Sequence, residues 1–156
     1  MRTQHLIDIA NLMAKEGRIG RPRQTSLNRA VSNAYYAMFH ALCRNCADTI
    51  VGTAGSNRSI GAWQQAYRSV EHNFAKNQCS RDEIKRFPSG IQDFAETFVV
   101  TQRIRQLADY DPQFSIPRSN TQIVIRSAQK AINKLEGTDR KDRLALAVWT
   151  VLKKRV

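Results

Sequence analysis

The sequence predicts an all-α protein, a single domain of residues 1–156 folded as a bundle of five to six helices. Apolar residues recur at helical spacing in successive segments, and no stretch of useful length alternates as a β-strand would. Neither an internal repeat nor a low-complexity segment divides the chain. At this length one hydrophobic core suffices, so neither a metal ion nor a disulfide is needed to hold the fold.

Two helices are expected in the first third of the chain. An apolar face over residues 3–16 predicts a short amphipathic helix that stops at Gly17, and the basic segment 17–24 is typical of a surface loop. Residues 25–51 contain neither glycine nor proline and are rich in alanine. This stretch predicts one long helix that Gly52 ends.

A third helix and a single turn are expected next. Trp63 to Phe74 has helical spacing of its apolar residues, which predicts the third helix. Ser80 and Glu83 match a capping box, which predicts one helical turn through Arg86.

The last half of the chain predicts three more helices. Ser89–Tyr110 begins with a residue suited to N-capping and is followed by Pro112, which cannot continue a helix. Residues 119–136 form the fifth periodic segment, with a glycine after it. Thr138 is expected to cap a sixth helix, which runs into a basic tail at residues 153–155.

The helix Ser89–Tyr110 carries a stripe that begins apolar and ends charged. At about 100° per residue, Gln102, Arg105 and Asp109 extend the face formed by the earlier apolar residues. Those apolar residues are Ile91, Phe94, Ala95 and Phe98, and the opposite side of the last turns carries Val100, Ile104 and Leu107. We therefore expect this end of the helix to be covered on more than one side. Arg105 and Asp109 then form either an intrahelical ion pair or part of a functional site.

The long helix 25–51 carries a second polar stripe. Its members share one helical face and combine a guanidinium, a hydroxyl, an amide, a phenol and an imidazole. They are Arg29, Ser32, Asn33, Tyr36 and His40. This mixture is unusual for a face exposed to solvent and would suit the wall of a polar cleft.

The charge of the chain limits its partners. Lys and Arg number 25 against 13 Asp and Glu, a formal net charge of +12. Such an excess attracts polyanions, of which nucleic acid is the commonest in the cytoplasm, although an acidic protein partner would meet the same charge. No apolar run approaches the ~20 residues that a membrane span requires, and the N-terminal residues lack the pattern of an export signal. We expect a cytoplasmic protein that does not enter a membrane.

Three cysteines indicate reduced thiols. Cys43 and Cys46, near His40, could hold zinc if Cys79 and His72 completed the site. Structural zinc ligands normally come from turns, so buried thiols that pack as small apolar groups are the favoured interpretation. No metal and no cofactor is predicted.

Two segments resemble the HEPN family, small helical-bundle domains of bacterial toxin–antitoxin and phage-defence systems. They are RAVSNAYYAMFHALCR, from Arg29 to Arg44, and RIRQLADYDP, from Arg103 to Pro112. The resemblance implies a homodimer in which equivalent helix ends face each other across a basic cleft. In active members, it further implies a metal-independent ribonuclease in which four to six residues separate an arginine from the histidine that follows it.

The sequence departs from that ribonuclease motif. Arg68 and His72 are one residue too close and lie on another helix, and Tyr110 stands where the histidine after Arg105 would be expected. Metal-independent RNA cleavage needs a proton acceptor, a cation for the phosphate and a proton donor. Arg105 would supply the cation, Tyr110 a donor and His40 the proton transfer, unless His40 is simply hydrogen-bonded within the bundle.

Three hypotheses of function follow. The first is an HEPN-like, homodimeric RNA- or nucleotide-binding domain with an altered ribonuclease site. The second is an active metal-independent endoribonuclease, and the third is an adaptor or neutralising subunit that binds an acidic protein. The candidate catalytic residues are Arg105, Tyr110 and His40, and the candidate ligand-binding residues are Arg29, Asn33, Tyr36, Arg103 and Asp109.

Overall fold

The computed structural model describes residues 3–15 and 23–156, and the regular structure in these ranges is all helical, with no strand. The helical segments are α1 (Thr3–Lys15), α2 (Gln24–Ile50), α3 (Ile60–Arg68), α4 (His72–Cys79), the 3-10 helix η1 (Asp82–Arg86), α5 (Ser89–Tyr110), α6 (Arg118–Glu136) and α7 (Arg140–Val151). The all-α class is therefore confirmed. The predicted stop at Gly17 and most of the predicted loop 17–24 lie outside the described residues.

The described residues contain seven α-helices, more than the expected five to six. The difference arises because the predicted helix from Trp63 to Phe74 is two helices, α3 and α4. Ser69 ends α3 by donating its hydroxyl to the carbonyl of Gln65 at 2.6 Å, and Val70 then turns into the core with 6% exposure. A serine hydroxyl that binds a carbonyl four residues back competes with the helix ladder, which favours a break here.

Several predicted N-caps are wrong, although the helix bounds are close. Thr138 and Ser80 do not cap the helices that follow them; they donate their hydroxyls to Lys134 O and Lys76 O, both at 2.8 Å. α5 begins at Ser89 as expected, but Pro88 is its N-cap and no side chain caps it. Thr138 and Ser80 each stand directly after the C-terminus of a helix. The last carbonyls of that helix lack backbone partners and therefore accept the hydroxyl in place of the N–H groups of the next helix.

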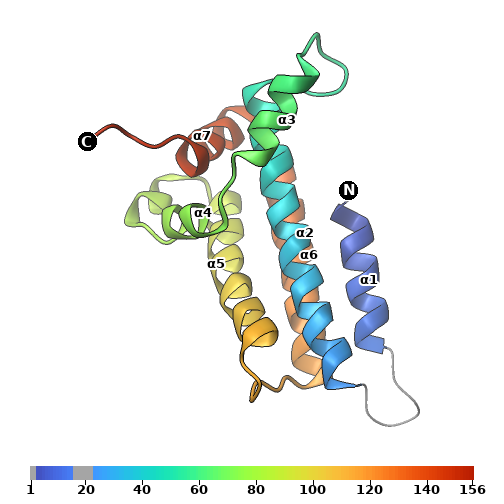
Figure 1. Cartoon of the computed structure of the whole chain (residues 1–156). Coiled ribbons are helices and arrows are strands. Elements are labelled where there is room, and N and C mark those ends of the chain that lie inside the picture. Colours follow the sequence, from blue (N-terminus) through green and yellow to red (C-terminus); the bar gives the residue numbers. More distant parts are fainter. Residues whose placement is uncertain (1–2, 16–22) are drawn as a thin grey trace.

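α2 lies at the centre of the bundle (Figure 1). α1, α5 and α6 pack along it, and α3 and α7 contact it towards its C-terminal end (Figure 1). Tyr35, Met38 and Leu42 of α2 and Phe94 and Phe98 of α5 have 0% exposure and form the middle of the core. Alanines on α2 allow this close approach, because they add little volume between the helices.

The inward stripe of α5 is confirmed, and the expected cover on its other side is incomplete among the residues that the structure describes. Gln102 and Arg105 are buried in continuation of the apolar residues, at 0% and 8% exposure. Val100 and Leu107 are 48% and 42% exposed, and Ile104 is half-buried. The outer face of α5 is thus open in this structure, and Val100 and Leu107 expose apolar surface on it with Arg103 between them.

None of the helices in the described ranges combines the length and the apolar content that a bilayer crossing demands.

Candidate functional site

Arg105 lies at the contact between α5 and α2. Its guanidinium carbon is 4.9 Å from the ring centre of Tyr35 and 5.6 Å from that of Tyr36. Arg105 donates to Asp109 Oδ2 at 3.3 Å, and the hydroxyl of Ser32 donates to Asp109 Oδ1 at 2.5 Å. The intrahelical ion pair therefore exists, and the hydrogen bond from Ser32 joins it to the polar stripe of α2.

The charge of Arg105 is stabilised where it lies. Burial works against the charged form, but the hydrogen bond to Asp109 and the two tyrosines outweigh it and hold the pKa of the guanidinium above its ordinary value. The ring faces carry negative quadrupole charge, which favours a cation over them. Arg105 is consequently a fixed cation at this position.

His72, the first residue of α4, joins the same group of side chains. Its Nδ1 shares a hydrogen bond of 2.6 Å with the hydroxyl of Tyr35, and its ring stacks on Phe39 with centres 3.8 Å apart. Burial first, and then the positive charge of Arg105, lower the pKa of His72 below its ordinary value. The imidazole is therefore mainly neutral at neutral pH. We call Ser32, Tyr35, Tyr36, His72, Arg105 and Asp109 the Arg105 cluster.

His40 lies at the edge of this cluster. Its Nδ1 is 2.5 Å from the hydroxyl of Tyr67 on α3, and burial lowers the pKa of its ring. His40 and His72 are each in ring contact with Phe39, and the charge of His40 contributes to the lowered pKa of His72. Two half-buried imidazoles thus share one phenylalanine ring of α2.

Buried polar atoms near Arg105 lack partners. Among the described residues, both amide atoms of Gln102 and the Nε of Arg105 are buried without a hydrogen bond. Such atoms cost free energy, typically ~1–3 kcal/mol each, and are uncommon in folded proteins. The inward face of α5 is therefore more polar than packing alone requires.

The other predicted site residues are dispersed. Asn33 donates to Met13 Sδ at 3.3 Å and so faces α1 instead of α5. Tyr110 is 77% exposed and lines a pocket of about 530 Å³ with Gln24 and Asn28, which touches the Arg105 cluster only through Asp109. The structure therefore does not bring Asn33 or Tyr110 into the Arg105 cluster.

The two remaining arginines among the candidates are exposed. Arg29 precedes Ser32 by one turn on α2, so the helical repeat places it towards the open end of the Arg105 cluster. Arg103 is two residues from Arg105 and faces another side of α5. Of the predicted residues, the cluster thus includes Arg105, Asp109 and Tyr36, with His40 at its edge.

Sequence reasoning missed His72 because it sought a histidine downstream of an arginine on one helix. The structure brings His72 to Arg105 from a different helix, through the break between α3 and α4. Its separation from Arg105 along the chain carries no information about this contact. The one available signal was the pair Tyr35 and Phe39, one turn apart, which offers an aromatic surface for an imidazole.

The cysteines are free, buried thiols, as the favoured interpretation expected. Burial raises the pKa of Cys46 to about 11, and those of Cys43 and Cys79 rise for the same reason. All three are therefore protonated at neutral pH. In the part of the chain that the structure describes, no three His, Cys, Asp or Glu side chains are grouped as metal ligands.

In comparisons with protein-family models, curated proteins and solved structures, nothing matched this chain.

Proposed function

We propose that this chain is an HEPN-like RNA- or nucleotide-binding domain of a bacterial defence or toxin–antitoxin system, and that the Arg105 cluster is its binding site. The observation that carries the proposal is the position of Arg105, held over two tyrosine rings and near His72, which shares a hydrogen bond with one of these tyrosines. Guanidinium groups suit phosphate because they donate paired hydrogen bonds in one plane.

The surroundings of the cluster support the same function. The chain carries a formal net charge of +12, so a polyanion is attracted to it before any specific contact forms. Arg29 is exposed on the same face of α2 as Ser32 and Tyr36, where it can meet a second phosphate. Among the described residues, Gln102 and Arg105 have buried polar atoms without hydrogen-bond partners, which is a pattern that selection for stability alone does not explain.

The binding test uses a labelled single-stranded RNA and fluorescence anisotropy across a range of salt concentrations. We expect affinity to fall steeply with salt, because counterions are released from the RNA on binding. Arg29→Ala should weaken binding more than Arg126→Ala, which removes the same charge from an exposed position on α6. Arg105→Lys keeps the charge but loses the planar fork, and should weaken binding about tenfold.

Three results would contradict the proposal. They are binding that does not depend on salt, equal effects of Arg29→Ala and Arg126→Ala, and full affinity in a folded Arg105→Lys variant. Circular dichroism and urea unfolding of each variant establish that a loss of affinity does not come from a loss of fold.

His72 favours a second candidate function, metal-independent RNA cleavage. In this reaction a base takes the proton of a 2′-hydroxyl, the 2′-oxygen attacks phosphorus, and the departing 5′-oxygen receives a proton. His72 and His40 are a neutral imidazole pair suited to the two proton transfers, and Arg105 is the cation beside them. This assignment uses His72 instead of Tyr110, whose side chain is 77% exposed.

Cleavage is tested by incubating RNA with the chain in the presence of EDTA. Products with 2′,3′-cyclic phosphate and 5′-hydroxyl ends are expected if the second candidate holds. His72→Ala and His40→Ala should each reduce the rate by about 100-fold or more, while His5→Ala, on an exposed face of α1, should leave it unchanged. If the wild-type chain binds RNA in a salt-dependent way but leaves it intact, the cleavage function is ruled out and only the binding function is retained.

We also propose that the chain acts as a homodimer. Its support within the chain is the apolar outer face of α5, where Val100 and Leu107 are exposed. An exposed apolar helix face is typical of an isologous interface.

A further inference from the structure

A groove lies between α4, η1, α7 and the C-terminal residues, and α4 contributes Phe74 and Gln78 to it. Its volume is about 660 Å³, and its apolar lining includes the aromatic rings of Phe74, Phe87 and Trp149. Val148 and Leu152 stand at the groove with 43% and 57% exposure. Two large aliphatic side chains therefore remain open to solvent beside an aromatic floor.

The floor of the groove is held by paired hydrogen bonds. Gln78 Nε2 donates to Trp149 O, and Trp149 Nε1 donates to Gln78 O, both at 2.9 Å. These two bonds join α4 to α7 and leave the indole with one orientation. A surface that is already ordered loses less conformational entropy when a partner binds.

The rim of the groove is basic. Four cations line it, Arg81, Lys153, Lys154 and Arg155, of which Arg81 pairs with Glu83 and Lys153 pairs with Glu71 at 3.6 Å. Arg81 lies 5.6 Å from the ring centre of Trp149, with Glu83 at 3.4 Å.

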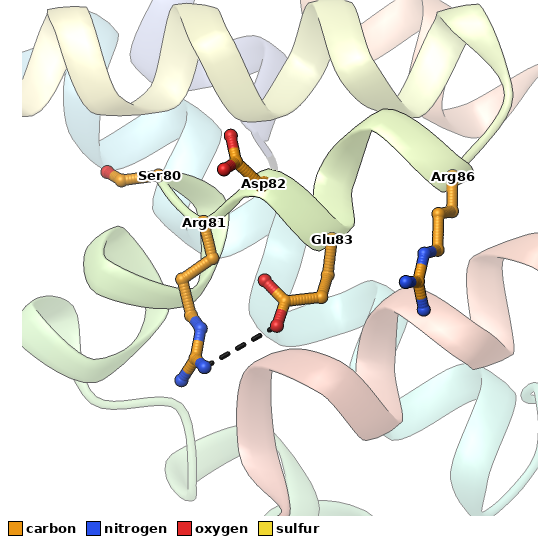
Figure 2. A pocket seen from close by; sticks show the side chains of 5 residues that line it. All are labelled: Ser80, Arg81, Asp82, Glu83 and Arg86. Carbon is orange, nitrogen blue, oxygen red and sulfur yellow. Dashed lines mark hydrogen bonds and ion pairs between the residues drawn. The ribbon is translucent and has the colours of Figure 1, made fainter.

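A second, more polar pocket adjoins the groove and shares Arg81 and Glu83 with it. Figure 2 shows this pocket, in which Arg81, Glu83 and Arg86 project to the same side of the chain. Arg86 therefore extends the basic edge beyond the aromatic floor.

We propose that this groove is a docking site for a protein segment that presents apolar side chains flanked by carboxylates. The apolar side chains would cover Val148, Leu152 and the aromatic floor, and the carboxylates would meet the basic rim. This surface is distinct from the Arg105 cluster, so the proposal does not depend on RNA binding.

The chemistry of the groove favours a protein segment over RNA. A stacking platform for bases needs a free ring face, but Arg81 covers Trp149 and Lys153 lies 5.2 Å from the ring centre of Phe74. The open groups are instead aliphatic, and aliphatic surface is covered best by apolar side chains.

The test is a selection of displayed random peptides on the full chain, followed by anisotropy measurements with the enriched peptides. We expect enriched sequences to combine apolar residues at helical or extended spacing with Asp and Glu. Val148→Asp should weaken their binding about tenfold or more, because it places a charge in the apolar part of the groove. Ile123→Asp is the matched control, since Ile123 is 53% exposed on α6, and it should leave binding unchanged.

A charge-reversal variant tests the contribution of the basic rim separately from that of the apolar surface. Lys154→Glu should weaken the selected peptides by a few-fold, with the effect shrinking at high salt. Binding of single-stranded RNA should be unchanged by Val148→Asp, so failure of this proposal is separable from failure of the proposed function.

Four outcomes would overturn the proposal. They are no enrichment of any acidic, apolar peptide, enriched peptides that bind Val148→Asp as tightly as the wild type, RNA binding that Val148→Asp abolishes, and self-association that Val148→Asp abolishes. The third outcome would assign the groove to nucleic acid, and the fourth would assign it to a second copy of the chain.

Discussion

Gln102 is fully buried in the middle of α5, and among the described residues neither atom of its amide has a partner. Replacing it with methionine keeps nearly the same shape and removes the unpaired atoms. We expect Gln102→Met to raise the free energy of unfolding by about 1 kcal/mol, measured by urea denaturation. Gln106→Met, at a half-buried position one turn later, should change it by less than ~0.5 kcal/mol.

The same variant tests why the amide is kept. If Gln102 serves the Arg105 cluster, a more stable Gln102→Met protein should bind RNA more weakly, because gains in stability often cost function at a site. Loss of stability in Gln102→Met would show that the amide is paired in solution.

The two half-buried histidines predict how stability changes with pH. Burial lowers the pKa of His72 and of His40 in the folded chain, whereas the unfolded chain has the ordinary value near 6.5. The unfolded state therefore binds more protons between these values. The stability that the neutral rings contribute is present above about pH 6.5 and is lost as the pH falls through their folded pKa values.

Urea unfolding from pH 7.5 to 5 should accordingly show a falling free energy of unfolding. His72→Gln should flatten this dependence, and His5→Gln, at an exposed position, should not. Parallel pH profiles for the wild type and His72→Gln would contradict the assignment.

At the scale of an element, Gly52 decides where the central helix ends. Its φ is +135°, and a Cβ at this position would collide with the hydroxyl of Ser56. We expect Gly52→Ala to lower the free energy of unfolding by roughly 1–3 kcal/mol, because side-chain-bearing residues rarely adopt this conformation. Gly55→Ala is the matched control, with no atom within 4 Å of its added carbon, and should be neutral within ~0.5 kcal/mol in the same urea experiment. Equal costs at the two positions would show that the turn after α2 relaxes freely.

At the scale of the whole molecule, the open apolar face of α5 predicts self-association. Leu107→Asp places a charge on this face without entering the core, since Leu107 is 42% exposed. We expect the wild-type chain to sediment as a dimer and Leu107→Asp to sediment as a monomer. Ile60→Asp, on α3 and 70% exposed, should remain dimeric. A monomeric wild type would remove both the dimer and the cleft that the family resemblance implies.

Local pattern was enough to establish the helical class and most of the helix limits. The apolar repeat predicted the inward stripe of α5 because the helical period assigns each residue to a face before any partner is known. The same repeat placed Arg105 and Asp109 one turn apart, and their ion pair follows from that spacing alone. The long α2 and its end at Gly52 follow equally from local preferences.

Contacts between helices were decided only in three dimensions. His72 meets Tyr35 because α3 and α4 separate at Ser69, and a break of this kind depends on which side chains the core accepts. Asn33 likewise faces Met13, and Tyr110 faces the first turn of α2. The helical period gives the direction of a side chain around its own helix axis, but only the packing of the helices decides which neighbour lies in that direction.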